Sequence, residues 1–177
     1  DVERSRGLGD VYKRQVQMLD ELEISAGVKW PNDIMLQNKK MGGVLSEVVS
    51  YGEKNVVIIG IGLNINTLQS DLDKIDQPAT SLYRETGSTY SVTEISSQLT
   101  HYIMENCAQV LRSGISPFYA FLQDRWLYLG EWIEVDTSTR SSFGKMVGVG
   151  LDGALQLQLA STKIVSIYSG KITIPQE

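Results

Sequence analysis

The chain has 177 residues and a formal net charge of -5, with 42% hydrophobic and 21% charged residues. This size and composition are typical of a globular protein with one domain, or with one domain and a small appendage. The negative charge argues against non-specific binding of nucleic acid, which depends on Lys and Arg neutralising phosphates. The longest apolar run, Val56 to Leu63, is too short to span a bilayer. We therefore expect neither a nucleic-acid partner nor a membrane partner.

The segment 1–15 mixes charges and glycines without a helical or strand period, and it shows no signal peptide. Because the chain begins with Asp1 rather than Met, we expect a fragment or a processed form, and we assign no function to this segment. The single cysteine, Cys107, cannot form an internal disulfide, which favours the cytoplasm. Its position among apolar residues at helical spacing predicts a core residue rather than a catalytic thiol.

The elements before residue 37 are predicted to be short. Apolar spacing over 16–24 indicates the end of a helix, which Ala26-Gly27 would stop. The segment 28–30 is typical of a strand that Pro31 breaks, because proline cannot donate to a central ladder. A second extended segment is predicted over 34–36.

A β-hairpin is predicted next, with a polar turn over 38–40, a strand over 42–50 and lysines at the tip or just past it. The nearly continuous apolar run Asn55–Ile61 is typical of a central strand that is buried on both faces. The long polar segment 68–89 is expected to be a functional loop or to carry short helices.

Two helices are predicted to follow. Ser91 and Glu94 have the spacing of a capping box at the start of the first helix, and Gly114 would end it. Ser116-Pro117 would begin the second, because the first turn of a helix does not need the N–H that proline lacks. The only histidine, His101, lies off the apolar stripe and is expected to be inert. The buried faces are predicted to be formed by Ile95, Leu99, Ile103, Cys107 and Leu111 and then by Phe118, Phe121, Leu122 and Trp126.

From Leu129 onward the apolar residues alternate, and Asp152-Gly153 is a strong hairpin-turn signal. This pattern predicts a small all-β barrel of about fifty residues that packs on the larger part of the chain. Its strands are expected over 132–135, 145–150, 154–159 and 164–168.

Three short blocks carry residues that a hydrophobic core would not select. Two lysines, a carboxylate and several glycines suit a ligand with phosphate, because an ammonium group neutralises an anion and glycines let a ligand approach the backbone. Lys29 and Lys40 could equally be solvated surface charges, and Asp33 could cap a turn or hold magnesium or a ribose. The blocks are Lys29-Trp30-Pro31-Asn32-Asp33, Lys39-Lys40-Met41-Gly42-Gly43 and Gly60-Ile61-Gly62-Leu63-Asn64-Ile65-Asn66.

Other kinds of site are poorly supported. A Rossmann nucleotide site needs a third glycine and a following helix, and the residues after Gly62 supply neither. The glycines alone could mark only a bulge or close packing. One His and one Cys cannot form a zinc site, and no Ser-His-Asp set is credible.

Together the three blocks resemble those of the biotin protein ligase family, and the resemblance extends from Val16 to the C-terminus. Pro78-Ala79-Thr80-Ser81-Leu82 and the segments 148–155 and 169–171 also agree with it. The resemblance implies an α+β fold: a partial class II synthetase-like catalytic domain with a mixed β-sheet and packed helices over 16–128. An SH3-like β-barrel over 129–177 would follow, and the segment 1–15 would not match.

The resemblance further implies the activity of a biotin–[acetyl-CoA-carboxylase] ligase. Such an enzyme uses ATP and Mg²⁺ to convert biotin into biotinyl-5′-AMP, and it then transfers biotin to a lysine of biotin carboxyl carrier protein. A homodimer is compatible with this family. Whether a DNA-binding repressor domain belongs to the whole protein is left open by this sequence.

The resemblance also assigns roles to individual residues. Lys40, with Lys29, would be catalytic, and Lys40 would contact both the biotin carboxylate and the α-phosphate. Biotin would be bound by Lys40, Gly43, Leu45, Gly60 and Gly62. ATP or the adenylate would be bound by Lys29, Asn32, Asp33 and Asn64, with Asp33 holding Mg²⁺ through ATP.

One departure from the family concerns the segment before these blocks. Members carry a glycine- and arginine-rich loop that closes over biotin, whereas Arg4-Ser5-Arg6-Gly7-Leu8-Gly9 matches it poorly and lies too near the first block. We therefore expect the later part of a ligase. Two alternatives stay open: an enzyme like lipoate-protein ligase, and a non-catalytic remnant that binds a ligand or a partner.

Overall fold

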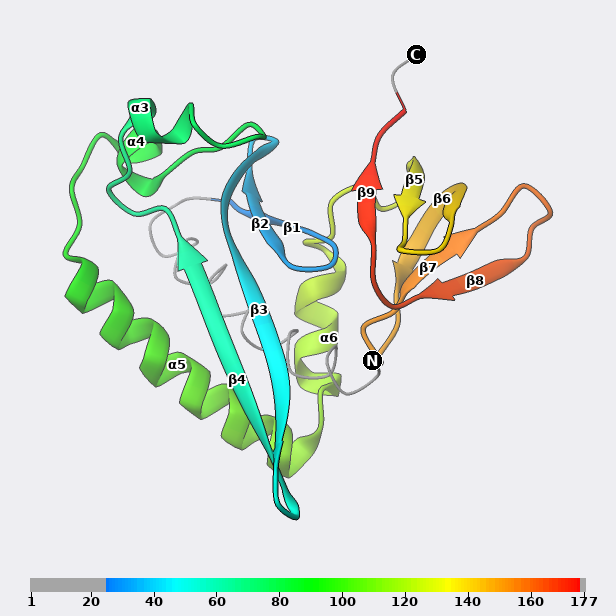
Figure 1. Cartoon of the computed structure of the whole chain (residues 1–177), viewed down its shortest axis with the longest axis horizontal. Coiled ribbons are helices and arrows are strands. Elements are labelled where there is room, and N and C mark those ends of the chain that lie inside the picture. Colours follow the sequence, from blue (N-terminus) through cyan, green and yellow to red (C-terminus); the bar gives the residue numbers. More distant parts are fainter. Residues whose placement is uncertain (1–24, 176–177) are drawn as a thin grey trace.

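The computed structural model of the chain describes residues 25–175. Within this range the strands form two sheets that lie beside each other, with helix α6 (Ser116–Gln123) between them (Figure 1). The helix predicted within 16–24 lies outside the described residues. In the described part of the chain, no helix is both long enough and apolar enough to cross a membrane.

The first sheet has four strands in the order β1-β2-β3-β4, and each neighbouring pair is antiparallel. Its strands are β1 (Gly27–Lys29), β2 (Asp33–Leu36), β3 (Lys39–Tyr51) and β4 (Lys54–Leu63). Gln37 and Asn38 form the turn between β2 and β3, and both have positive φ angles, of 48° and 62°. Two such residues match the twist of a tight hairpin, so Lys39 and Lys40 open β3 rather than form the tip.

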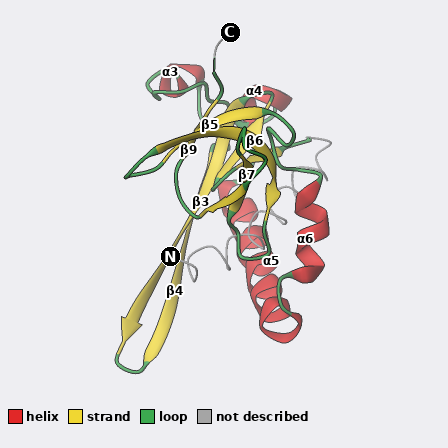
Figure 2. Cartoon of the chain, turned by 90° about the vertical axis from the view of Figure 1, so that its right-hand side faces the viewer, coloured by secondary structure: helices red, strands yellow, loops and turns green. Residues whose placement is uncertain are grey.

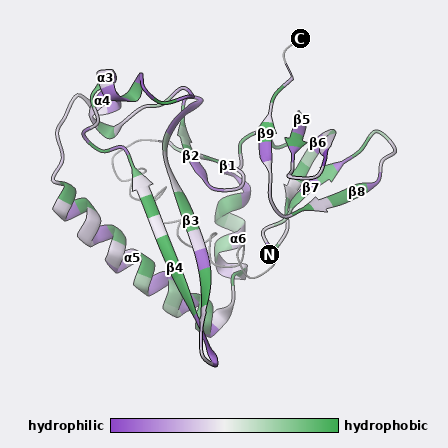
Figure 3. Ribbon diagram, in the orientation of Figure 1, coloured by the Kyte–Doolittle hydropathy of each residue, from purple (hydrophilic) through white to green (hydrophobic). Residues whose placement is uncertain are grey.

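The apolar strand β4 lies at the edge of the described sheet, so the prediction of a central strand buried on both faces is wrong. Among the strands of residues 25–175, β4 pairs with β3 alone, and the two strands project as a ribbon (Figure 2). Figure 3 shows that much of this ribbon is hydrophobic, yet Val56, Val57 and Ile58 are about half exposed. An apolar run predicts that a strand tends to be buried, but the order of the strands decides which neighbours cover it.

Helices α5 (Val92–Ser113) and α6 lie on the same side of the first sheet (Figures 1 and 2). The hydroxyl of Ser91 accepts a hydrogen bond from the Glu94 N–H at 3.3 Å, which confirms the predicted start of α5. Ile95 and Leu99 of the predicted stripe are buried, but Leu111 at the far end is 88% exposed. Two short helices, α3 (Gln69–Leu72) and α4 (Leu82–Thr86), lie in the long polar segment 68–89, in agreement with the expectation that it could carry short helices.

The second sheet has five antiparallel strands in the order β8-β7-β6-β5-β9. They are β5 (Trp132–Asp136), β6 (Ser141–Val149), β7 (Leu155–Gln158), β8 (Ile164–Ile167) and β9 (Lys171–Thr173). The alternating pattern predicted β5 to β8, whereas β9 is too short to stand out. The end strands β8 and β9 do not pair with each other, so the described residues form an open sheet and not the predicted closed barrel.

The α+β class is confirmed, and each sheet has its own hydrophobic core. Parallel pairing is limited, among the described residues, to isolated bridges from Val28 to Trp126 and from Lys40 to Ala79. The first core includes Val28, Ile34, Leu36, Met41, Val44, Ile65, Leu82, Ile95, Leu99 and Leu122. The second includes Trp30, Ile133, Val135, Met146, Val149, Leu155, Leu157, Ile167 and Ile172.

Trp30 joins the two sheets. It follows β1 in the first sheet, but it is only 2% exposed and packs in the core of the second. Its indole N–H donates to the carbonyl of Gly153 at 3.0 Å. A second link is the Tyr119 hydroxyl of α6, which donates to the carbonyl of Val149 at 2.8 Å. The turn between β1 and β2 is therefore held against the second sheet by both packing and hydrogen bonding.

Candidate ligand-binding site

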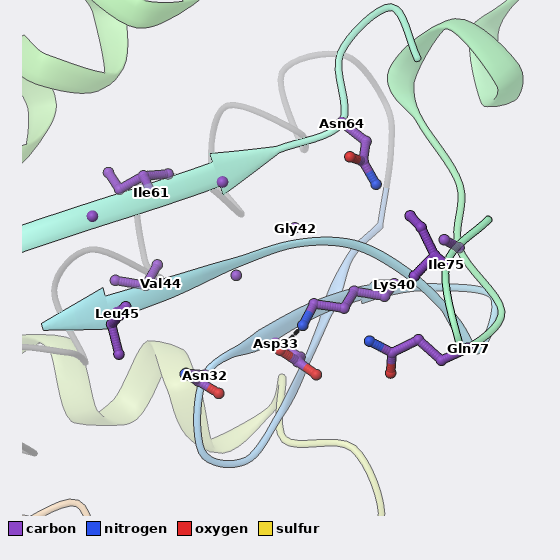
Figure 4. A pocket seen from close by; sticks show the side chains of 14 residues that line it. Asn32, Asp33, Lys40, Gly42, Val44, Leu45, Ile61, Asn64, Ile75 and Gln77 are labelled. Atoms are coloured by element: carbon purple, nitrogen blue, oxygen red, sulfur yellow. Dashed lines mark ion pairs between the residues drawn. The ribbon is translucent and has the colours of Figure 1, made fainter. Parts of the chain in front are cut away.

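A pocket of about 630 Å³ lies over strands β2, β3 and β4 and is bounded by the loop that precedes Pro78 (Figure 4). Every predicted site residue except Lys29 lines it: Asn32, Asp33, Lys40, Gly43, Leu45, Gly60, Gly62 and Asn64. The residues come together because Gly43 is the register partner of both Asp33 and Gly62, and Leu45 is opposite Gly60. The three sequence blocks therefore form one surface.

Lys40 and Asp33 form an ion pair inside the pocket. The Lys40 ammonium lies 2.6 Å from an Asp33 carboxylate oxygen, and 30% of the lysine side chain is exposed (Figure 4). The backbone of Lys40 is fixed as well, because its N–H donates to the carbonyl of Pro78 and its carbonyl accepts from the N–H of Thr80, at 2.8 and 2.9 Å. The ammonium group is thus placed at the pocket while its charge stays accessible to a ligand.

The glycines of the pocket have two different roles. A Cβ atom on Gly42 would lie 2.5 Å from the Gly62 carbonyl, and one on Gly43 would lie 3.0 Å from the Asn32 carbonyl and 3.3 Å from the Asp33 carboxylate. These two positions allow the strands to pack closely. A Cβ on Gly60 would meet only the Leu45 carbonyl at 3.7 Å, and one on Gly62 would meet nothing within 4 Å. Gly60 and Gly62 therefore leave open space on the pocket wall.

The two asparagines after β4 also differ. The Asn64 side chain lines the pocket and donates to the carbonyl of Thr80 at 3.0 Å. Asn66 instead bonds to the backbone of Tyr90 in both directions, donating to its carbonyl at 2.7 Å and accepting from its N–H at 3.0 Å. Asn64 can orient a ligand, whereas Asn66 holds the segment that leads into α5.

Lys29 does not line the pocket, although it is the register partner of Asp33, which does. Its ammonium is 5.9 Å from the centre of the Tyr128 ring, where a cation interacts favourably with the aromatic face. Partial burial lowers the pKa of Lys29 from 10.5; nearby Asp33 acts in the opposite direction, while Lys171 and Lys40 lower it further. Lys29 thus lies between the pocket and the second sheet.

Six lining residues were not predicted from the sequence. Gly42 and Ile61 belong to blocks already identified and Val44 directly follows the second block, so the neighbouring residues were the available signal. Ile75, Gln77 and Ala79 come from the loop before and within Pro78-Ala79-Thr80. The signals for this loop were its length and the agreement of Pro78-Ala79-Thr80-Ser81-Leu82 with the family.

Several other chemical groups are separate from the pocket. Among residues 25–175 there is no cluster of three or more His, Cys, Asp or Glu side chains that could hold a metal by themselves. His101 is exposed on α5, with its Nε2 atom 3.4 Å from a Glu105 carboxylate oxygen. Cys107 is a partly buried residue of the same helix, and neither residue lines the pocket.

Residues 7–64 match the model of the biotin/lipoate A/B protein ligase family. The match begins inside the segment 1–15, earlier than the resemblance seen in the sequence motifs. The chain is 28% identical over 162 residues to the bifunctional ligase/repressor BirA of Bacillus subtilis, covering 90% of this chain and 50% of the relative. It is 32% identical over 135 residues to a biotin–[acetyl-CoA-carboxylase] ligase of Paracoccus denitrificans, covering 74% and 56%. The chain spans about half the length of the curated relatives it matches.

Solved structures agree with these relatives. The biotin protein ligase of Aquifex aeolicus has a TM-score of 0.81 and 29% identity, with 99% of this chain and 77% of that chain covered. The same ligase in complex with biotin and ATP has a TM-score of 0.77 and 25% identity, with 98% and 72% covered. From the sequence blocks, the fold and these similarities together, the chain belongs to the biotin protein ligase family.

Proposed function

We propose that this chain is the ligase part of a protein that activates biotin with ATP and transfers it to a lysine of biotin carboxyl carrier protein. The observation that carries the proposal is the Lys40–Asp33 ion pair at a pocket whose wall is opened by Gly60 and Gly62. The chain's relatives include a biotin–[acetyl-CoA-carboxylase] ligase, and a structural neighbour is a ligase in complex with biotin and ATP.

In the first step, a carboxylate oxygen of biotin attacks the α-phosphorus of ATP. A bond forms between that oxygen and phosphorus, the bond to the pyrophosphate group breaks, and biotinyl-5′-AMP results. Both reactants are anions, so their repulsion opposes the attack. The Lys40 ammonium offsets this charge where the two groups meet, and its fixed backbone means that little reorganisation is needed. Gly43, Leu45, Gly60 and Gly62 would bind the biotin ring system along β3 and β4.

The nucleotide would bind at the turn between β1 and β2. In this proposal Lys29, Asn32 and Asp33 contact ATP, and Asn64 contacts the adenylate from the end of β4. The fit to magnesium is reasonable, because Asp33 offers one carboxylate at the pocket and Mg²⁺ is usually held by one or two carboxylates together with substrate phosphates. When bound, the ion would neutralise phosphate charge.

In the second step, the amine of the acceptor lysine attacks the acyl carbon of biotinyl-5′-AMP. An amide bond forms and AMP leaves. The nucleophile belongs to the carrier protein, so this chain needs only to hold the adenylate and leave its acyl carbon accessible. We assign no covalent catalyst to residues 25–175.

We propose further that the chain divides near Leu129 into a catalytic part over 16–128 and an SH3-like domain. Support comes from the backbone, since Leu127 still bonds to Val28 in the first sheet whereas Gly130 bonds to Met146 in the second. The exposed apolar edge of β4 is compatible with a homodimer, because an open edge can pair with another chain. Cys107 is the single cysteine of this 177-residue sequence and can form no internal disulfide, which fits a cytoplasmic location.

Calorimetric titration of the 177-residue chain with biotin, lipoate and biotinyl-5′-AMP tests the proposal. We expect saturable binding of biotin and tighter binding of the adenylate, which uses both halves of the site. Preference for lipoate would instead assign the chain to the lipoate branch of the matched family. A folded sample that binds none of the three would contradict the proposal and favour a non-catalytic remnant.

A further inference from the structure

The segment 78–82 is hydrogen-bonded both to Lys40, near the start of β3, and to Asn64, just after β4. The N–H of Thr80 donates to the Lys40 carbonyl at 2.9 Å. The carbonyl of Thr80 accepts from the side-chain amide of Asn64 at 3.0 Å. The N–H of Leu82 adds a bond to the Asn64 carbonyl, also at 3.0 Å. Thr80 therefore contacts two residues whose side chains both line the pocket (Figure 4).

The side chain of Thr80 is held from helix α4. Thr80 is only 2% exposed, and its hydroxyl donates to a carboxylate oxygen of Glu85. Glu85 is fixed in turn by the helix, where its N–H donates to the carbonyl of Ser81 at 3.1 Å. A hydrogen bond to an ionised carboxylate is about twice as strong as one between neutral groups. Thr80 is thus tied to β3, to the end of β4 and to α4.

Two neighbouring hydroxyls show that a hydroxyl here does not need a carboxylate partner. The Ser81 hydroxyl donates to the carbonyl of Thr67, and the Thr86 hydroxyl donates to a carbonyl of its own helix, both at 2.8 Å. Such backbone partners are usual for side-chain donors. The bond between Thr80 and Glu85 instead depends on two side chains. Neither residue is among the described residues that line the pocket, so any effect on the chemistry is indirect.

We propose that Thr80, held by Glu85, is a positioning residue for adenylate formation, which fixes Lys40 and Asn64 relative to each other. This inference rests on the proposed function, in which Lys40 offsets the charge of the reacting anions and Asn64 contacts the adenylate. Electrostatic stabilisation of a transition state requires groups that are already in place, and a misplacement of about 1 Å can cost about a hundredfold in rate. Thr80 touches no reacting group and acts through its two neighbours.

The test is to measure formation of biotinyl-5′-AMP by the whole chain and by Thr80→Val. This variant keeps a side chain of similar shape and both backbone hydrogen bonds, but it lacks the hydroxyl. We expect kcat to fall about ten- to a hundredfold and KM for biotin to change less than about threefold, because the loss concerns the transition state. Thr80→Ser keeps the hydroxyl and should restore most of the activity. Thermal unfolding of each variant shows that the rates are compared between folded proteins.

Glu85→Ala tests the same hydrogen bond from its partly exposed partner, where a substitution disturbs the core less. It should also lower kcat with little change in KM. The double variant Thr80→Val/Glu85→Ala should lose no more activity than Thr80→Val alone, because residues that act as a unit have non-additive effects.

Thr86→Val is the matched control. It removes a threonine hydroxyl of the same helix, whose acceptor is the carbonyl of Leu82 and not a side chain. Because this bond does not hold Thr80, the variant should leave both kcat and KM unchanged.

Three results would overturn the inference while leaving the proposed function intact. The first is an unchanged kcat in Thr80→Val. The second is a loss that Thr80→Ser does not restore, or one that appears equally as a higher KM for biotin, which would indicate a general disturbance of the fold. The third is additive loss in the double variant, which would show that Thr80 and Glu85 act separately. If the parent chain forms no biotinyl-5′-AMP, the proposed function fails and the inference fails with it.

Discussion

The first sheet keeps many of its side chains partly exposed around a pocket, whereas the second sheet buries its inward-facing side chains in a closed core. On β3, Leu45 is 60% exposed, and no residue of β4 is fully buried. On β5, by contrast, Ile133 and Val135 have no exposed surface. The first sheet carries the residues assigned to chemistry, and the second provides a fully buried core against which the β1–β2 turn packs. Trp30 connects the two sheets, because it directly follows β1 of the first sheet while its side chain packs in the core of the second.

Removal of the Trp30 side chain, which connects the two sheets, should have the largest effect on stability. Trp30→Ala should lower the free energy of unfolding by about 3–5 kcal/mol, because it leaves a cavity in the second core and an unpaired Gly153 carbonyl. Trp132→Ala is the matched control, since Trp132 is 47% exposed and stacks on Phe143 at the surface. Urea denaturation measures both. Similar losses for the two variants would show that Trp30 does not join the sheets.

Removal of the Lys40 side chain should impair catalysis while leaving the stability of the fold nearly unchanged. Lys40→Ala should reduce biotinyl-5′-AMP formation by about a hundredfold or more, because the charge that offsets the reacting anions is lost. Thermal unfolding should change little, since the Lys40–Asp33 pair is partly exposed. Lys39→Ala removes the preceding, exposed lysine and should leave turnover intact. Unchanged adenylate formation by Lys40→Ala would remove its assigned role.

The two kinds of glycine offer a sharper contrast within the first sheet. Gly42→Ala should cost about 1–3 kcal/mol of stability, because its Cβ would lie 2.5 Å from the Gly62 carbonyl. A Cβ atom at Gly62 would have no neighbour within 4 Å, so Gly62→Ala should preserve stability. Its methyl group should nevertheless occupy part of the pocket and weaken biotin binding. Denaturation and biotin titration are both needed. Full biotin affinity in a folded Gly62→Ala protein would place biotin elsewhere.

The smallest expected effect concerns pH. The pKa of Lys29 in the folded chain is below 10.5, so at alkaline pH the unfolded chain holds this proton more tightly than the folded chain does. The free energy of unfolding should therefore rise with pH between the folded-state pKa and 10.5. Lys29→Met should lack this rise, so the parent chain should gain stability relative to the variant as pH increases. Denaturation at a series of pH values measures the free energy of unfolding of both proteins. The same pH dependence in the parent chain and in Lys29→Met would contradict the prediction. Lys163→Met is the control for removal of a different lysine.

The local chemistry of the chain could be predicted from its sequence. Ser91 and Glu94 predict the start of α5 because a capping hydroxyl satisfies a free N–H within three residues. Asp152-Gly153 predicts a turn for a similarly local reason: the Asp152 carboxylate accepts from the Ala154 N–H, and Gly153 has a φ of 79°. The blocks around Asp33, Lys40 and Gly62 could be selected because they contain charges and glycines where a core would place apolar residues.

The tertiary structure decided which faces of these elements are covered and which blocks meet. β4 is as apolar as a central strand, but its place at the edge of the described sheet leaves Val56 and Ile58 exposed. Lys29 and Lys40 look equivalent in sequence, yet only Lys40 lines the pocket, whereas the ammonium of Lys29 lies over the Tyr128 ring. Strand order and the burial of Trp30 depend on contacts between residues distant in the chain. Residue type and short spacing determine local bonds, but such long-range contacts become visible only when the whole chain is folded.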